Sequence, residues 1–196
     1  MKLSQKIYLP FKYLIDAIGS FVGIVVCFLL LWWWILIVNT IVIRGNPVFA
    51  SKRVGKNNKT FKCFKFRSMR KCANPNMASC EPDSKDLVSK FGKFLRKTSL
   101  DETLQLINIL IGQMSFIGPR PLINNSNDAV TIMIRSENGA NLIRPGMSGY
   151  AQVHGRTKIT TKEKGDLDGY YYKNFSFLLD IKIFFQTFFG VCDKGE

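Results

Sequence analysis

The residues with the clearest chemical potential are Asp101 and Glu102, in the segment Ser99-Leu100-Asp101-Glu102. Ser99 and Glu102 have the S-x-x-E spacing of a capping box, which predicts a helix that begins at Ser99. The exposed N–H groups and the dipole of a first helical turn favour negative charge, so acidic residues there are common without any function. The same electrostatics would keep Asp101 ionised at neutral pH and available as a metal ligand or nucleophile.

Three turns in the second half of the chain each carry an arginine. Arg120 lies between Pro119 and Pro121, whereas Arg144 and Arg156 lie beside proline or glycine. Proline restricts the backbone of such a turn, and a guanidinium group can form two parallel hydrogen bonds to a phosphate. Each arginine alone is typical of a solvated surface, but three such turns close in sequence predict one convergent anion site.

Other catalytic arrangements are excluded by the residue types. His154 is the one histidine, which rules out a histidine-rich zinc site, and we interpret it as a turn residue. The five cysteines form no C-x-x-C pair, which argues against a disulfide framework and favours a reducing, cytosol-facing setting. Asp166 and Asp168 precede three tyrosines, where a helix-start role and a bond to a sugar hydroxyl are both open.

The composition describes a folded, basic chain. Its 196 residues carry a formal net charge of +14 and are 46% hydrophobic, which excludes an intrinsically disordered chain and allows one domain with a small appendage. The excess of cations predicts polyanionic partners, such as anionic lipid, phosphorylated substrates or nucleic acid. No reading motif for nucleic acid is present, so we expect no nucleic-acid partner.

A long apolar segment lies near the N-terminus, where no charged residue occurs between Asp16 and Arg44. A segment of this length is long enough to cross a bilayer and too long for a secretory signal. The basic residues that follow Arg44 predict that the domain after it is cytosolic, and the lysines upstream resist export of the N-terminus. A straight span and a re-entrant helix that bends near Gly23 or the tryptophans at 32–34 are therefore both open, and we favour the re-entrant form.

The remaining elements predict an α+β fold with a membrane-inserted segment at 1–43 and a compact, largely helical cytosolic domain at 44–196. Alternation of apolar and basic residues predicts a small β-hairpin around the turn at 55–58. Helices are expected at 84–97, 99–111 and 129–138, the second with Leu100, Leu104, Ile107 and Ile111 on its apolar face. Apolar residues at helical spacing over 177–189 predict either a core helix or an amphipathic helix in the membrane interface.

Six motifs run in order through nearly the whole chain: KRVG at 52–55, FKFRSM at 64–69, LDETLQLINIL at 100–110, MSFIGPRP at 114–121, RPGMSGYAQVHGR at 144–156 and LD at 167–168. Together they resemble the small monotopic phosphoglycosyl transferases, the bacterial sugar transferases that begin surface-glycan assembly. The resemblance implies Mg²⁺-dependent transfer of a phosphosugar from a UDP-sugar to a polyprenol phosphate, with release of UMP, at the cytoplasmic face of the bacterial inner membrane.

The resemblance also assigns roles to residues. It makes Asp101 and Glu102 catalytic and metal-binding, with Asp101 as the nucleophile, and it makes Arg96 a basic active-site residue and the Pro119-Arg120-Pro121 turn part of a nucleotide site. The other candidate substrate-binding residues are Lys65, Arg67, Arg144, Arg156 and Asp168. The runner-up function is a non-enzymatic, membrane-anchored basic module that binds anionic lipid.

Two positions depart from the family pattern. Gln113 stands where the family commonly has an aspartate, so the role of that carboxylate is lost or moved. The family's membrane helix is often turned back by a Ser-Pro pair, whereas the corresponding region here, about 30–34, has no proline. This second departure bears on the membrane geometry and leaves the chemistry unaffected.

Overall fold

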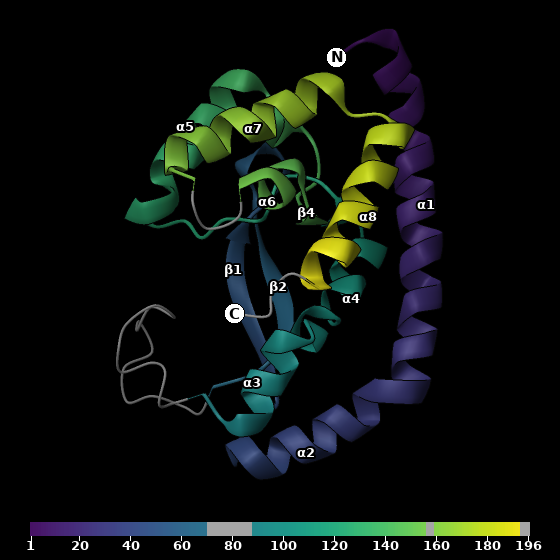
Figure 1. Ribbon diagram of the computed structural model, residues 1–196, viewed down its shortest axis with the longest axis vertical. Helices are drawn as coiled ribbons and strands as arrows, with labels where there is room; N and C mark the ends of the chain where they lie inside the picture. The colour runs from purple at the N-terminus through teal and green to yellow at the C-terminus, as the bar shows by residue number, and fades with distance from the viewer. Residues whose placement is uncertain (70–87, 156–158, 193–196) are drawn as a thin grey trace. The chain divides into compact units, whose positions relative to one another are not determined.

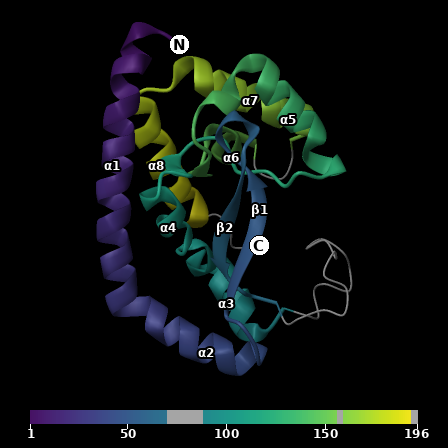
Figure 2. The same ribbon diagram turned by 180° about the vertical axis from the view of Figure 1, so that it is seen from behind.

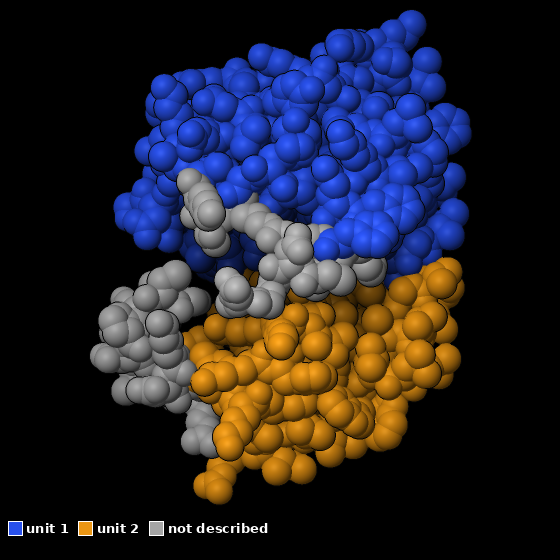
Figure 3. Space-filling view, viewed as in Figure 1, with its two compact units in different colours: residues 1–20, 52–62, 108–196 blue, residues 21–51, 63–107 orange. Residues whose placement is uncertain are grey.

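The computed structural model describes residues 1–69, 88–155 and 159–192. They form two compact units that interleave along the chain (Figure 3). Unit 1 contains Met1–Ser20, Lys52–Lys62 and Asn108–Glu196, and unit 2 contains Phe21–Ser51 and Cys63–Ile107. Several elements begin in one unit and end in the other. The predicted boundary between 1–43 and 44–196 concerns the membrane, and it stays a prediction.

The N-terminal apolar segment is helical from Leu3 to Ile43, a run of 41 residues that is long and apolar enough to cross a membrane. It consists of α1 (Leu3–Cys27), a π-helical turn η1 (Phe28–Trp32) and α2 (Trp33–Ile43). The helix changes direction at η1 (Figure 1). A π-helical turn inserts an extra residue into the helical hydrogen-bond ladder, so it can bend a helix without proline. The bend lies beside the tryptophans, one of the two positions that the sequence left open, and the re-entrant form stays a prediction.

One face of α1 is polar and buried, while the rest of the helix is apolar and largely exposed. The buried side chains are those of Gln5, Lys12, Asp16 and Ser20, and all four belong to unit 1. Gln5 donates to the carbonyl of Tyr172, so this face is bound to the body of unit 1. A helix in water buries its apolar face instead. This inverted arrangement fits a helix whose outer side meets an apolar medium.

The predicted hairpin is present as β1 (Val48–Val54) and β2 (Thr60–Phe66), joined through η2 (Lys56–Asn58), and the two strands lie side by side in Figure 2. A second two-stranded sheet was not predicted. It pairs β3 (Ser115–Ile117) in parallel with β4 (Gly146–Ser148). Strands of three residues are too short to produce a visible alternation of apolar and polar residues.

The helices that lie wholly in unit 1 are α5 (Ser126–Asn138), α6 (Tyr150–Gly155), α7 (Thr161–Asn174) and α8 (Phe177–Cys192), with the 3-10 turn η5 (Ala140–Leu142) after α5. The helix predicted at 129–138 is confirmed as α5. The unit's core is formed by apolar side chains from its strands, helices and loops: Ile117, Ile143, Tyr171, Phe175 and Ile183. Most of the apolar residues of α8 are exposed, so the interpretation of that helix as a core helix is wrong.

Unit 2 contains α3 (Lys90–Lys97), the 3-10 turn η4 (Leu100–Glu102) and the start of α4 (Gln105–Leu110). Its core contains Trp32, Ile35, Phe66, Leu95 and Leu104. The predicted helix over 99–111 is wrong as one continuous element, because η4 interrupts it and Ile111 is exposed. The first part of the helix predicted over 84–97 lies outside the described residues.

Candidate functional site

Asp101 and Glu102 lie on the tight turn η4, directly after α3. Ser99 precedes this turn with a φ of 57°, in the left-handed region, and its side chain makes no capping hydrogen bond. The predicted capping box at Ser99 is therefore wrong. An N-cap residue needs an extended backbone, whereas Ser99 reverses the chain at the end of α3 and donates its N–H to the carbonyl of Arg96.

The carboxylates are flanked by cations of the same unit. Lys65, on β2, contacts Glu102 with an Nζ to Oε1 distance of 2.5 Å. Arg96, near the end of α3, donates from Nε to the hydroxyl of Ser68 at 2.7 Å. The structure therefore gathers four predicted site residues, Asp101, Glu102, Lys65 and Arg96, in unit 2.

A glycine on α3 allows this part of the site to form. A Cβ atom at Gly92 would lie 2.0 Å from the carbonyl oxygen of Ser68, so only glycine lets the helix approach the end of β2 so closely. The approach places the Ser68 hydroxyl within reach of Arg96. Sequence reasoning missed both Gly92 and Ser68, because their importance depends on a contact between distant segments.

Burial raises the pKa of Asp101 above its ordinary value, and the neighbouring Glu102 carboxylate raises it further. Lys65 and Arg96 act in the opposite direction, since their positive charges favour the ionised carboxylate. The sequence predicted only the stabilising influences on the charged form. The structure adds the desolvation that opposes them, and desolvation also makes a carboxylate a better nucleophile once it is ionised.

The bend of the apolar helix is bonded directly to the segment that carries the carboxylates. The indole N–H of Trp32, the last residue of η1, donates to the hydroxyl of Thr103 at 3.0 Å. The Trp32 ring also packs edge-on against Phe66 of β2. This contact places Asp101 and Glu102 next to a segment that is apolar enough to enter a membrane.

Adjacent carboxylates are suitable oxygen ligands for Mg²⁺, which proteins commonly bind through one or two carboxylates together with phosphate oxygens and water. Asp101 and Glu102 fit this pattern, with Glu102 sharing its charge with Lys65. Among the described residues, no group of three or more histidine, cysteine, aspartate or glutamate side chains could hold a metal on its own. A cation bound by these two carboxylates would complete its coordination with water or with oxygens of a substrate.

Arg67 and Arg144 each lie over an aromatic ring. In unit 2, the Arg67 guanidinium is 5.9 Å from the centre of the Phe49 ring, and its buried Nε has no hydrogen-bond partner within the described chain. In unit 1, the Arg144 guanidinium is 3.7 Å from the centre of the Tyr13 ring. Such stacking leaves the N–H groups at the edge of the guanidinium available for an anion.

The Pro119-Arg120-Pro121 turn and Asp168 are linked in unit 1 through a residue that sequence reasoning missed. Arg135, on α5, donates to the Arg120 carbonyl at 2.9 Å and to the Asp168 carboxylate from two nitrogens, at 2.8 and 2.5 Å. Asp168 is 1% exposed, in the interior of α7. The helix-start role considered for Asp168 is wrong, because α7 begins at Thr161 and its capping box is formed by Thr160 and Glu163.

Two further sequence predictions concern Arg156 and Gln113. Arg156 lies outside the described residues, so the convergence of three arginine turns stays a prediction. Gln113, which replaces the aspartate common in the resembling family, accepts a hydrogen bond from the side-chain amide of Asn108 at 2.8 Å. Asn108 also donates to the Lys62 carbonyl. An amide oxygen at position 113 can thus accept the hydrogen bond that a carboxylate there would accept.

Comparison with known proteins gives a consistent picture. A model of the family described as bacterial sugar transferase matches residues 7–194. The uncharacterised sugar transferase EpsL of Bacillus subtilis is 38% identical over 144 residues, which cover 73% of this chain and 69% of that protein.

Two similar proteins have names that state an activity. The UDP-N-acetylgalactosamine-undecaprenyl-phosphate N-acetylgalactosaminephosphotransferase of Aeromonas hydrophila is 40% identical over 146 residues, which cover 73% of this chain. The UDP-glucose:undecaprenyl-phosphate glucose-1-phosphate transferase of Klebsiella pneumoniae is 37% identical over 158 residues, which cover 78% of this chain. The chain spans 34% of the length of each of these two relatives.

Proposed function

This chain belongs to the bacterial sugar transferase family, and on that premise we propose that it transfers a sugar phosphate from a UDP-sugar to a polyprenol phosphate, with release of UMP. The observation that carries the proposal is the half-buried Asp101 carboxylate, beside Glu102 and under the influence of the cations Lys65 and Arg96. This arrangement suits nucleophilic attack on a phosphorus atom whose oxygens are negatively charged.

In the proposed reaction, an Asp101 carboxylate oxygen attacks the β-phosphorus of the UDP-sugar. The bond between that phosphorus and the bridging oxygen breaks, and UMP leaves with the bonding electron pair. A phosphate oxygen of the polyprenol phosphate then attacks the same phosphorus, forms the diphosphate link and releases the Asp101 carboxylate. In this proposal Lys65 and Arg96 neutralise charge on the transferred group, a contribution that grows as charge develops.

Mg²⁺, when bound, would neutralise diphosphate oxygens and assist the departure of UMP. Asp101 and Glu102 would hold it. In unit 1, the Pro119-Arg120-Pro121 turn and Arg144 are proposed to bind an anionic group of the substrate, with Arg135 fixing the Arg120 backbone. These proposed roles rest on the charge of the arginine side chains, on the restricted backbone of the proline-containing turn and on the family to which the chain belongs.

The direction of the Asp101 pKa shift gives a pH prediction. The carboxylate must be ionised to attack, so the rate of its reaction with UDP-sugar should rise with pH as Asp101 loses its proton. Replacing Lys65 with methionine removes a charge that lowers this pKa, so the rise should move to higher pH. This shift is measured from the profile of kcat/KM against pH. Lys62→Met, an exposed lysine on the same strand, should leave the rise in place, and an unshifted profile for Lys65→Met would contradict the assignment.

The membrane geometry that we propose is a re-entrant helix, with the N-terminus and the domain at 44–196 both on the cytoplasmic face of the inner membrane. The turn η1 bends the helix, and the polar face of α1 is bonded to unit 1. Lys12 of α1 forms an ion pair with Asp180 of α8 at 2.6 Å, and Asp16 accepts from the N–H of Phe116 at 3.1 Å. These bonds hold the first half of α1 on the side of the membrane where its partners lie.

This topology predicts a labelling pattern. In a cysteine-free variant, a cysteine placed at Leu3, which is 75% exposed, should be protected from a membrane-impermeant thiol reagent in intact cells and labelled after lysis. A cysteine at Glu137, on the exposed side of α5, serves as the matched control for the cytosolic domain. Labelling of position 3 but not of position 137 in intact cells would show that the helix spans the membrane.

The transfer reaction itself is tested with the full chain in detergent, a panel of UDP-sugars, polyprenol phosphate and Mg²⁺. We expect one or a few donors to release UMP and to yield a polyprenyl diphosphate sugar. The alternative, a lipid-binding module without catalytic activity, also fits the basic flank of the apolar helix. Release of no UMP from any donor, by a protein that still binds anionic vesicles, would favour that alternative.

A further inference from the structure

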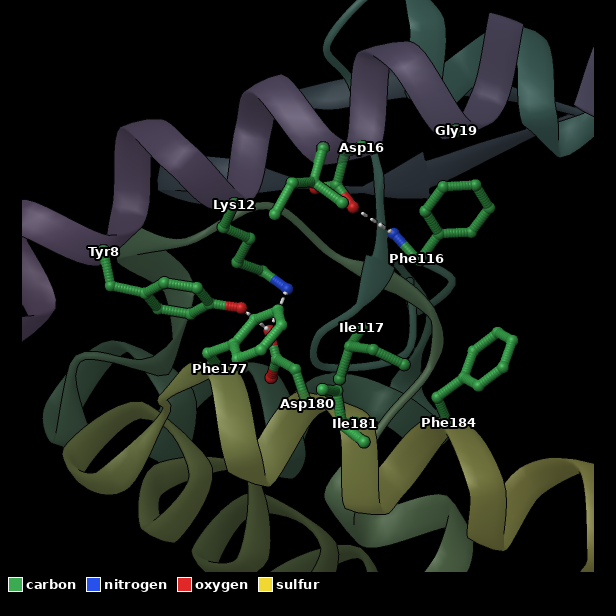
Figure 4. Close-up of a pocket in the computed structure, with 11 residues that line it drawn as sticks. Tyr8, Lys12, Asp16, Gly19, Phe116, Ile117, Phe177, Asp180, Ile181 and Phe184 are labelled. Carbon is green, nitrogen blue, oxygen red and sulfur yellow. Dashed lines mark hydrogen bonds and ion pairs between the residues drawn. The ribbon is translucent and has the colours of Figure 1, made fainter. Parts of the chain in front are cut away.

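A cavity of about 280 Å³ lies in unit 1 between α1 and α8 (Figure 4). Ile15 and Gly19 line it from α1, and Phe177, Ile181 and Phe184 line it from α8. The surface of the cavity is almost entirely carbon. Its volume is near the lower end of the range for ligand pockets, about 300–1,000 Å³.

The cation in the wall of this cavity, Lys12, is bonded to a carboxylate of the same wall. Asp180 accepts from the Nζ of Lys12 at 2.6 Å and from the hydroxyl of Tyr8 at 2.8 Å (Figure 4). One carboxylate oxygen of Asp16 accepts from the backbone N–H of Phe116, and the other is buried without a hydrogen-bond partner among the described residues. Lys12 is the one basic residue among those that line the cavity, and it is paired. A ligand with a charged head group would therefore find no unpaired cation in this wall, whereas a hydrocarbon chain needs none.

The same two helices carry exposed apolar side chains beside the cavity. Phe11 and Ile18 of α1 and Leu178 and Phe185 of α8 are all more than half exposed. A soluble protein rarely exposes so much apolar surface on neighbouring helices, and the inverted polarity of α1 already indicates an apolar medium. The cavity thus lies between two surfaces that suit contact with lipid chains.

We propose that this cavity binds one acyl chain of a membrane phospholipid, which holds α1 and α8 against the bilayer. The occupant is inferred from the carbon lining, the pairing of Lys12 with Asp180 and the continuity with the exposed apolar faces. Its binding does not depend on the transfer chemistry proposed above. A phospholipid chain is favoured over the polyprenol phosphate because the residues that line the cavity offer no unpaired cation for a phosphate monoester.

Photo-crosslinking tests the proposal in the full chain. The protein is placed in bilayers of phosphatidylethanolamine and phosphatidylglycerol that contain a trace of phosphatidylcholine with a diazirine in one acyl chain, then irradiated, digested and mapped by mass spectrometry. The diagnostic residue is Ile117, which lines the cavity but is only 5% exposed, so that a bilayer chain reaches it through the cavity. We expect an adduct at Ile117 in the wild type.

Two tryptophan variants of α8 separate cavity binding from general membrane contact. Ile181→Trp fills the cavity and should lower the Ile117 adduct about ten-fold, because the indole occupies the space that the chain needs. Leu178→Trp adds similar bulk at a position that is 77% exposed and outside the cavity, and it should leave the adduct unchanged. Ile181→Ala changes the same position but enlarges the cavity, so it should retain the adduct. This variant keeps the test informative if the tryptophan of Ile181→Trp disturbs folding.

Three results would overturn the proposal. These are the absence of an Ile117 adduct in the wild type, an equal loss in Ile181→Trp and Leu178→Trp, and suppression of the adduct by a small molar fraction of polyprenol phosphate. The last result would assign the cavity to the acceptor. UMP release is measured on the same samples. Loss of the Ile117 adduct with UMP release retained would contradict only the acyl-chain proposal, and loss of UMP release with the adduct retained would contradict only the transfer proposal.

Discussion

Asp101→Asn is expected to abolish the covalent phosphosugar adduct and to lower turnover by about three orders of magnitude or more. Removal of the catalytic nucleophile has an effect of this size in other enzymes. Asparagine keeps the size and hydrogen-bonding shape of aspartate, so the turn η4 should persist. Its neutral amide lacks the nucleophilic oxygen and the negative charge. Mass spectrometry of peptides from wild-type protein mixed with UDP-sugar alone should locate a phosphosugar on Asp101, with release of UMP before any acceptor is added.

The matched control for this experiment is Glu137→Gln, which makes the same change from carboxylate to amide at an exposed position of α5. It should leave both the adduct and turnover unchanged. An adduct on another residue, or UMP release that requires the lipid acceptor, would exclude Asp101 as the nucleophile. Full activity of Asp101→Asn would exclude the proposed mechanism altogether.

Asp168→Asn is expected to destabilise unit 1 by about 3–5 kcal/mol, because it leaves the buried Arg135 guanidinium without its counter-charge. In a chain of this length, that loss corresponds to a decrease of about 10 °C in the unfolding midpoint. The measurement is a thermal unfolding curve of the full protein in detergent. Lys164→Met, which breaks the longer and more exposed pair with Asp128 at 3.7 Å, should cost less than about 1 kcal/mol.

The double variant Arg135→Met/Asp168→Leu tests the physical reason for that loss. It removes both charges and retains apolar volume, so it should recover most of the stability that Asp168→Asn loses. Asp168 was also predicted to bind substrate. If Asp168→Asn unfolds like the wild type but raises KM for the UDP-sugar, its carboxylate acts on the substrate, and the destabilisation argued here is wrong.

The sequence by itself determined the features that depend on local pattern. Alternating apolar and basic residues predicted the hairpin β1–β2, and the uncharged stretch between Asp16 and Arg44 predicted the apolar helix. The upstream lysines and the tryptophans at 32–34 favoured a bend in that helix. The order of the motifs predicted the family that the match over residues 7–194 then showed. These features are readable because neighbouring side chains largely decide strand, helix and membrane preference.

The tertiary structure alone decided which of several local possibilities was realised. The S-x-x-E spacing is compatible with a cap at Ser99, but the end of α3 requires a left-handed residue there, and Glu102 pairs with Lys65 instead. Lys12 and Asp16 looked like membrane-flanking charges, yet Lys12 bonds to Asp180, 168 positions away in sequence. The free-energy cost of burying a charge is offset by a partner group that the fold brings near. That partner is often distant in sequence, so no local pattern encodes it.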